Sequence, residues 1–309
     1  ASHLRVGTFQ FFAARGDIPR LQRLLDYAVA RHDPDLVDAP RPALGLLDAV
    51  IRRQSSLIAQ WMHLGFIHGV MNTDNVTISG ETIDYGPCAF LDFYEPTTVY
   101  SSIDHGGRYA YGNQPTIGLW NMARLAEALL PLIDDDQDRA VELATESLDR
   151  YEGHYDTAWL AGMRSKLGLA GEHPDDRSLA DAWLALLRSN RVDFTTAFRR
   201  LTDAADGSLD GRVGLTSLFD EPIGDWLDRW TARRAPDAES TMRASNPVYV
   251  PRNHLVEEAL AAATDGDMTT FQDLLDVVTR PFDEQTGRER FAEPAPDEFS
   301  RGYRTFCGT

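Results

Sequence analysis

The sequence contains few cysteines. Only Cys88 and Cys307 occur among its 309 residues, which is too few for the disulfide framework of a small secreted domain. The chain also does not open with a charged segment followed by an apolar run, as a signal peptide would. We therefore expect a reducing compartment and predict a cytoplasmic, bacterial-type chain.

Long apolar runs and an excess of positive charge are missing as well. No run approaches the ~18 apolar residues that a membrane-spanning helix needs, so no membrane partner is expected. The net charge of −18 argues against a nucleic-acid partner, because binding to phosphates needs a basic surface. The length and the 43% of hydrophobic residues suffice for one large domain or two ordinary domains with a sizeable core.

One stretch gathers polar turn residues next to short β-branched runs. Residues 76–79 read as a strand, residues 80–81 as a tight turn, and residues 82–84 as the returning strand of a hairpin. Such a hairpin would bring Asp84 back beside Asn75. A carboxylate and an amide oxygen that face each other are hard ligands of the kind Mg²⁺ prefers, with phosphates and water completing its octahedron.

The same order of parts occurs in kinase-like phosphotransferases, where a metal-binding Asn and a metal-binding Asp flank a hairpin. In small-molecule kinases the loop carries an Asp directly after His-Gly. In this chain Val70 follows His68-Gly69, and a carboxylate stands instead at Asp74. Two rival interpretations stay open beside an active enzyme: a kinase-like phosphotransferase and a catalytically dead scaffold. The loop residues are also ordinary turn and cap formers.

A kinase-like nucleotide site normally also has a lysine on a small β-rich lobe with a Gly-rich loop. The only lysine is Lys166, and no paired glycines or strand series precede Gly65. The chain opens at Ala1 without a methionine. We therefore expect that the N-terminal nucleotide-binding lobe is absent, which leaves half of the nucleotide cleft missing and keeps two alternatives open, an active and an inactive fragment.

The rest of the chain is predicted to be almost wholly helical. Apolar residues recur at helical spacing in residues 17–32, 43–64, 116–133 and 140–169. Shorter helices are expected at residues 178–188, 193–203, 224–234 and 255–263. Gly65 is expected to end the second helix, and His63 and His68 are interpreted as structural, with His68 bracing the loop through a hydrogen bond to backbone.

Three motifs resemble the selenoprotein O family: residues 68–75, 82–87 and 90–92. Weaker similarity extends from residue 1 to about residue 285. The resemblance implies an α+β, mostly α chain with a protein-kinase-like fold. It also implies that residues 1–133 form the C-lobe core with catalytic loop, metal-binding hairpin and activation-like segment, and that residues 134–309 form a helical extension of the same lobe.

The resemblance further implies a protein adenylyltransferase. Such an enzyme transfers AMP from ATP to Ser, Thr or Tyr hydroxyls of proteins and releases pyrophosphate, with Mg²⁺, or Mn²⁺ as the alternative ion. Asn75 and Asp84 are then the metal ligands, and Asp84 and Arg5 contact the nucleotide. Asp74 is the candidate catalytic base that accepts the hydroxyl proton.

The family places a Cys or selenocysteine near the C-terminus, where this chain has Cys307. In some members it pairs with a cysteine of the segment after Asp84-Tyr85-Gly86, where this chain shows Tyr100. A Cys88–Cys307 bridge is one hypothesis, and two independent thiols are the other. His105 in the same segment is interpreted as a surface group rather than a general base.

Overall fold

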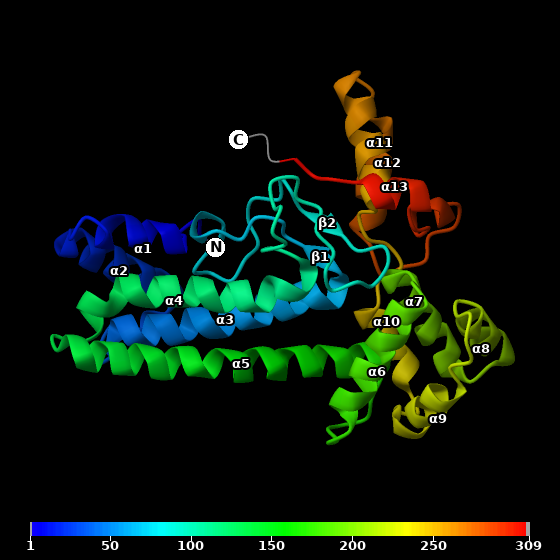
Figure 1. Cartoon of the computed structure of the whole chain (residues 1–309), viewed down its shortest axis with the longest axis horizontal. Coiled ribbons are helices and arrows are strands. Elements are labelled where there is room, and N and C mark those ends of the chain that lie inside the picture. The colour runs from blue at the N-terminus through cyan, green and yellow to red at the C-terminus, as the bar shows by residue number, and fades with distance from the viewer. Residues whose placement is uncertain (1, 307–309) are drawn as a thin grey trace.

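Figure 1 shows the computed structural model, which describes residues 2–306. Three long helices lie side by side and form the body of the molecule: α3 (Pro42–Leu64), α4 (Gln114–Ile133) and α5 (Gln137–Leu167). Both α4 and α5 pack along α3. The predicted long helices are therefore confirmed, with ends displaced by a few residues.

The remaining helices lie at the two ends of this body (Figure 1). At one end are α1 (Val6–Ala13) and α2 (Ile18–His32). Towards the other end follow α6 (Asp176–Ser189), α7 (Phe194–Asp203), α8 (Leu209–Thr216), α9 (Gly224–Arg233), α10 (Ala238–Ser245), α11 (Asn253–Thr264), α12 (Thr269–Val278) and α13 (Asp297–Gly302). Short 3₁₀ turns are η1 (Pro34–Leu36), η2 (Thr73–Asn75), η3 (Tyr111–Asn113), η4 (Ala204–Asp206) and η5 (Glu289–Phe291).

Local sequence explains where α3 begins and ends. Pro42 stands at its first position, where a missing N–H is harmless and the fixed φ suits a helix. Gly65 ends the helix in the left-handed conformation with φ 70°, as predicted. This sharp ending turns the chain directly into the segment that carries the candidate site.

The apolar faces of the helices build two large cores and one small one. One core joins α1, α2 and the first halves of α3 and α5 to α4. The other joins the second halves of α3 and α5 to α6, α7, α9 and α10, and includes the stacked rings of Trp183 and Trp226, whose centroids lie 4.5 Å apart. The small core lies between α11 and α12. Because α3 and α5 enter both large cores, they tie the two ends of the molecule together.

Strands are scarce, which confirms the mostly α class. The sheet consists of β1 (Phe66–Ile67) and β2 (Ala89–Phe90), antiparallel, with Phe66 opposite Phe90. The predicted hairpin over residues 76–84 is shorter than expected: the chain turns back, but its two arms meet in a single antiparallel bridge, Val76 to Thr82. The physical reason is that residues 76–78 use their backbone groups to pair with residues 4–6 instead.

No helix among residues 2–306 is both long and apolar enough to cross a membrane.

Candidate functional site

The N-terminal segment and the loop after β1 pair with each other across a long stretch of sequence. Two backbone hydrogen bonds, with N···O distances of 2.9 and 3.0 Å, join residues 4–6 to residues 76–78. Within this pairing Arg5 lies opposite Thr77. The pairing therefore brings Arg5 next to the turn that contains Asp74 and Asn75.

Asp74 lies in the 3₁₀ turn η2 and is exposed. Its carboxylate lies against Gly7 in the first turn of α1, so closely that a Cβ atom added at Gly7 would come within 2.0 Å of Oδ1. Only glycine leaves room for the carboxylate in this position.

Asn75 is half-buried and fixed by its own amide. Its Nδ2 donates a hydrogen bond of 3.0 Å to the carbonyl oxygen of Val70. Val70, which stands where small-molecule kinases have an Asp, thus contributes its backbone carbonyl as an acceptor. Because the amide nitrogen is engaged there, Oδ1 is the atom of Asn75 available to a cation.

Asp84 is exposed and has φ 60°, one of two non-glycine residues with positive φ among the described residues. Asp and Asn tolerate this left-handed conformation better than most residues. The preceding residue is held by His68, whose Nε2 donates to the Ile83 carbonyl oxygen at 2.9 Å. The prediction that His68 braces the loop by bonding to backbone is therefore confirmed.

Of the two histidines predicted to be structural, His68 is buried and His63 is half-buried, and both have a lowered pKa. Burial lowers the pKa of His68, although the Ile83 carbonyl and the nearby charge of Asp84 act in the opposite direction. Burial lowers the pKa of His63 to about 4, and its Nε2 donates to the Trp159 carbonyl oxygen at 2.9 Å. Neither ring serves as a metal ligand in this arrangement.

The segments that carry the two predicted metal ligands touch each other. A Cβ atom added at Gly69 would lie 2.5 Å from the carbonyl oxygen of Pro87, so the backbones of the two loops are in close contact. Asn75 bonds to the residue after Gly69, and Asp84 precedes Pro87 by three positions. Among residues 2–306, no group of three or more His, Cys, Asp or Glu could hold a metal by itself. A cation would therefore need ligands from a bound nucleotide or water.

Four buried or nearly buried amide side chains hold these loops, and sequence reasoning missed all of them. Gln54 of α3 donates to the Thr77 carbonyl at 2.6 Å, and Asn121 of α4 donates to the Met71 carbonyl at 3.0 Å. Gln114 donates to the Phe66 carbonyl oxygen and accepts from the His68 amide. Asn253 donates to the Phe90 carbonyl oxygen and accepts from the Phe90 amide. The signal in the sequence was an amide within an otherwise apolar helix face.

Comparison with known proteins assigns the chain to a family. A family model described as protein adenylyltransferase SelO matches residues 1–279. The chain belongs to the SelO family. This confirms the resemblance that the motif residues carried.

Curated relatives of this chain within the SelO family are named protein nucleotidyltransferase YdiU. The relative from Cereibacter sphaeroides is 58% identical over 315 residues, the one from Mycobacterium sp. is 56% identical over 313, and the one from Chromobacterium violaceum is 55% identical over 319. Each alignment covers 100% of this chain. The chain spans 64% of the length of the first two relatives and 66% of the third.

The cysteine hypothesis of the SelO resemblance rests partly outside the described residues, because Cys307 lies beyond residue 306. Cys88 is half-buried, and burial raises the pKa of its thiol to about 11. Little thiolate is present at neutral pH, so Cys88 is a weak nucleophile in this conformation. His105 lies exposed on its loop, as expected for a surface group.

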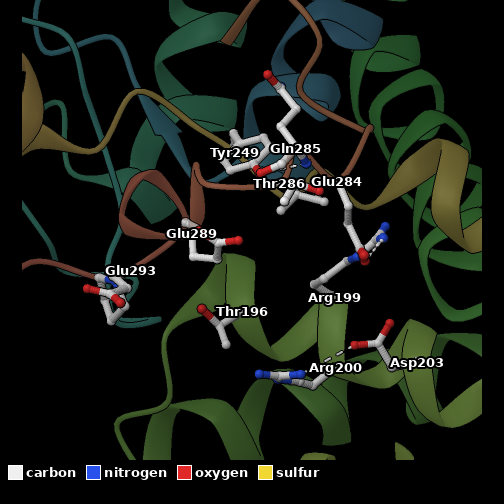
Figure 2. A pocket seen from close by; sticks show the side chains of 13 residues that line it. Thr196, Arg199, Arg200, Asp203, Tyr249, Glu284, Gln285, Thr286, Glu289 and Glu293 are labelled. Carbon is white, nitrogen blue, oxygen red and sulfur yellow. Dashed lines mark hydrogen bonds and ion pairs between the residues drawn. The ribbon is translucent and has the colours of Figure 1, made fainter. Parts of the chain in front are cut away.

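Two hollows differ in their relation to these residues. One of about 300 Å³ is lined by residues 2–3 and 81–83, the last of which precedes Asp84 in the chain. Figure 2 shows another, of about 490 Å³, between α7 and residues 284–294. In the second hollow Arg199 pairs with Glu284 at 2.6 Å, and none of the predicted site residues lines it. The candidate site is therefore the loop region around residues 66–87.

Proposed function

We propose that this chain carries the catalytic loop and metal ligands of a protein adenylyltransferase. The reaction is transfer of AMP from ATP to a Ser, Thr or Tyr hydroxyl of a protein, with release of pyrophosphate. The observation that carries the proposal is the pairing of residues 4–6 with residues 76–78. It gathers Arg5, Asp74 and Asn75 from distant parts of the sequence, in a chain that belongs to the SelO family.

The oxygen atoms of Asn75 and Asp84 fit a hard divalent cation, Mg²⁺ or Mn²⁺. One carboxylate and one amide are a typical protein share of such a site, because Mg²⁺ keeps several waters and binds substrate phosphates. When bound, the ion neutralises phosphate charge and fixes the geometry of the polyphosphate. Asp84 is exposed and Asn75 has its amide nitrogen fixed on Val70, so both oxygens can reach a ligand.

Asp74 is the group that accepts the proton. The acceptor hydroxyl oxygen bonds to the α-phosphorus of ATP, the bond from that phosphorus to the bridging oxygen breaks, and pyrophosphate leaves with the electron pair. The hydroxyl proton passes to the Asp74 carboxylate. Arg5 is the residue that steadies phosphate oxygens, because a guanidinium forms paired hydrogen bonds with them.

The protein-kinase-like fold belongs to this proposal as well. Residues 1–133 would form the core of the large lobe and residues 134–309 its helical extension, an arrangement supported by the packing of α5 along α3 and α4. The nucleotide-binding lobe would come from the part of the relatives that this chain does not span. A cytoplasmic location fits the low cysteine content.

The test uses ATP labelled at either the α- or the γ-phosphate, given to the chain and, in parallel, to the Cereibacter sphaeroides relative. We expect protein to become labelled only from the α position, and Asp84→Asn to lower the labelling about 100-fold or more. The matched control is Asp135→Asn, which neutralises an exposed carboxylate between α4 and α5. Label entering only from the γ position would refute the proposal and favour a kinase.

A nucleotide-binding scaffold without catalysis is the remaining rival, and Val70 is the residue that favours it. A thermal-shift measurement with ATP, with and without Mg²⁺, separates the two. Stabilisation that needs Mg²⁺ and disappears in Asp84→Asn supports a working metal site. Equal stabilisation in both variants, with no labelled protein, supports the scaffold.

A further inference from the structure

A groove runs along the segment that follows the candidate site. It consists of two hollows, of about 260 and 340 Å³, that share Val99 and Arg304 in their linings. One wall is formed by residues 92–107 and the other by the C-terminal tail at residues 300–304. Figure 1 shows the tail leaving α13 and crossing the loops on the side of the molecule where β1 and β2 lie.

The tail is fixed to this segment by hydrogen bonds. The Thr305 amide donates to the Tyr100 carbonyl at 2.8 Å, and the Ser102 amide donates to the Thr305 carbonyl at 2.9 Å. The Thr305 hydroxyl donates to the Pro87 carbonyl at 2.8 Å, three residues after Asp84. The tail is therefore bonded both to the segment that lines the groove and to Pro87, three residues after the proposed metal ligand Asp84.

The carboxylates that line the groove already have partners. Asp92 is buried and lies 3.3 Å from the guanidinium of Arg252. Glu95 accepts from Arg188 at 3.0 Å. Asp104 accepts hydrogen bonds from two backbone amides of its own loop. The negative charge of the walls is thus engaged within the protein.

The cations of the groove are in the opposite situation. Arg191 and Arg304 are exposed, and neither has a carboxylate oxygen within 4.0 Å among residues 2–306. Arg301 has only an exposed partner, Asp297, at 3.4 Å. His105 lies at the far end of the groove. Three exposed arginines thus line one groove, in a chain with a net charge of −18, while the carboxylates of its walls are engaged elsewhere.

Arg191 is also held in an unusual backbone conformation. It follows α6 with φ 51°, in the left-handed region where glycine is the favoured residue after a helix. Its guanidinium lies over the ring of Phe93, 4.8 Å from the centroid, at the edge of the groove. A strained residue whose side chain is fixed at a groove is a reason to look for a ligand there.

We propose that this groove binds an acidic segment of the acceptor protein, next to the hydroxyl that receives AMP. The inference deepens the proposed function, because it names the kind of acceptor that the site selects. Glutamate or aspartate side chains would pair with Arg191, Arg301 and Arg304. The tail wall would hold the segment beside residues 92–107, so that a neighbouring hydroxyl could reach towards Asp84.

The test measures binding without nucleotide, so it does not depend on AMP transfer. The probe is a fluorescein-labelled peptide with a central serine flanked by glutamates, and its partner has glutamines in their place. By fluorescence anisotropy at about 50 mM NaCl, we expect the glutamate peptide to bind about tenfold more tightly, and the difference to shrink at about 300 mM. Arg304→Gln and Arg191→Asn should each weaken the glutamate peptide about three- to tenfold, because asparagine keeps the left-handed backbone.

Arg23→Gln is the matched control, since Arg23 is an exposed arginine of α2 outside the groove. Equal affinities for the two peptides, or an equal loss in Arg23→Gln, would overturn the groove as a binding site. Displacement of the glutamate peptide by pyrophosphate would also overturn it, because the groove would then be a phosphate site. Peptide binding by this chain, with no AMP transfer by the Cereibacter sphaeroides relative, would refute the proposed function alone.

Discussion

The helical body and the loop region at residues 65–112 are held together by different forces. In the body, α3, α4 and α5 pack through apolar faces that form two large cores. The loop region contains only two strands of two residues each, and its backbone is bound by buried amides from the surrounding helices. The body is stabilised by the apolar surface that its helices bury, and the loop region by individual hydrogen bonds.

This difference means that the two regions respond differently to substitution. An apolar core tolerates changes that conserve volume, because dispersion and the hydrophobic effect have no fixed direction. A buried backbone group that loses its partner suffers the full loss of solvation. The positions of Asp74, Asn75 and Asp84 therefore depend on a few polar side chains outside the site.

The largest effect is expected for Arg252→Met. Arg252 is 1% exposed and pairs with Asp92 at 3.3 Å and Asp193 at 2.7 Å, which joins the loop region to the start of α7. Removing it leaves two buried carboxylates without a cation, so we expect a loss of about 3–5 kcal/mol in the free energy of unfolding by urea denaturation.

The control for this variant is Arg290→Met. Arg290 pairs with Glu258 at 2.6 Å, but both side chains are about half exposed. A loss of less than about 1 kcal/mol is expected there. Equal losses in the two variants would mean that the buried ion pairs stabilise the fold no more than an exposed ion pair does.

The next effect sharpens the comparison between the regions directly. Gln114→Leu leaves the His68 amide and the Phe66 carbonyl without partners, so we expect a loss of about 2–4 kcal/mol in the free energy of unfolding. Leu125→Ala, in the core face of the same helix, should cost about 2–5 kcal/mol. Hydrogen exchange tells them apart: amides of residues 66–71 should exchange faster only in Gln114→Leu, and an identical pattern would contradict the comparison.

Lys166 gives the body a dependence on pH. It is buried on α5, with its ammonium 4.0 Å from the centroid of the Phe198 ring, and burial lowers its pKa to about 7. An unfolded lysine titrates near ~10.4, so between these values the unfolded chain binds one proton more than the folded chain. Stability should therefore rise with pH in this window, by about 1.4 kcal/mol per pH unit from this group.

Lys166→Met removes that contribution. Its gain in stability over the wild-type chain should be largest below pH ~7 and shrink as the pH approaches ~10.4. Urea denaturation across this range measures it. If the difference in unfolding free energy between the two chains does not change with pH, burial does not lower the pKa of Lys166.

The smallest effect on stability, with a large effect on activity, is expected for Gly7→Ala. The new methyl group would displace the Asp74 carboxylate, so AMP transfer should fall roughly 100-fold while stability changes by less than about 1 kcal/mol. Gly153→Ala is the control, because nothing lies within 4 Å of a Cβ at that position of α5. Unchanged transfer in Gly7→Ala would argue against Asp74 as the base.

The sequence allowed the helices to be predicted well, because the apolar stripes of α2, α3, α4 and α5 repeat within each segment. At residues 76–84 the sequence predicted a longer local hairpin than the single bridge between Val76 and Thr82. The partner strand lies about seventy residues earlier, at residues 4–6, and periodicity carries no information about so distant a pairing. The residues of the candidate site were found from motif order. The amides that hold them were not, because each appears in the sequence as a single amide on an apolar helix face and its backbone partner lies in a distant segment.

Both ends of the described chain converge on the loop region. Residues 4–6 pair with residues 76–78, and residues 303–305 run beside residues 100–102. A fusion tag or fluorescent label at either terminus would therefore crowd the candidate site. Insertion at the exposed turn around Gly171, where nothing lies within 4 Å of an added Cβ, would leave it clear.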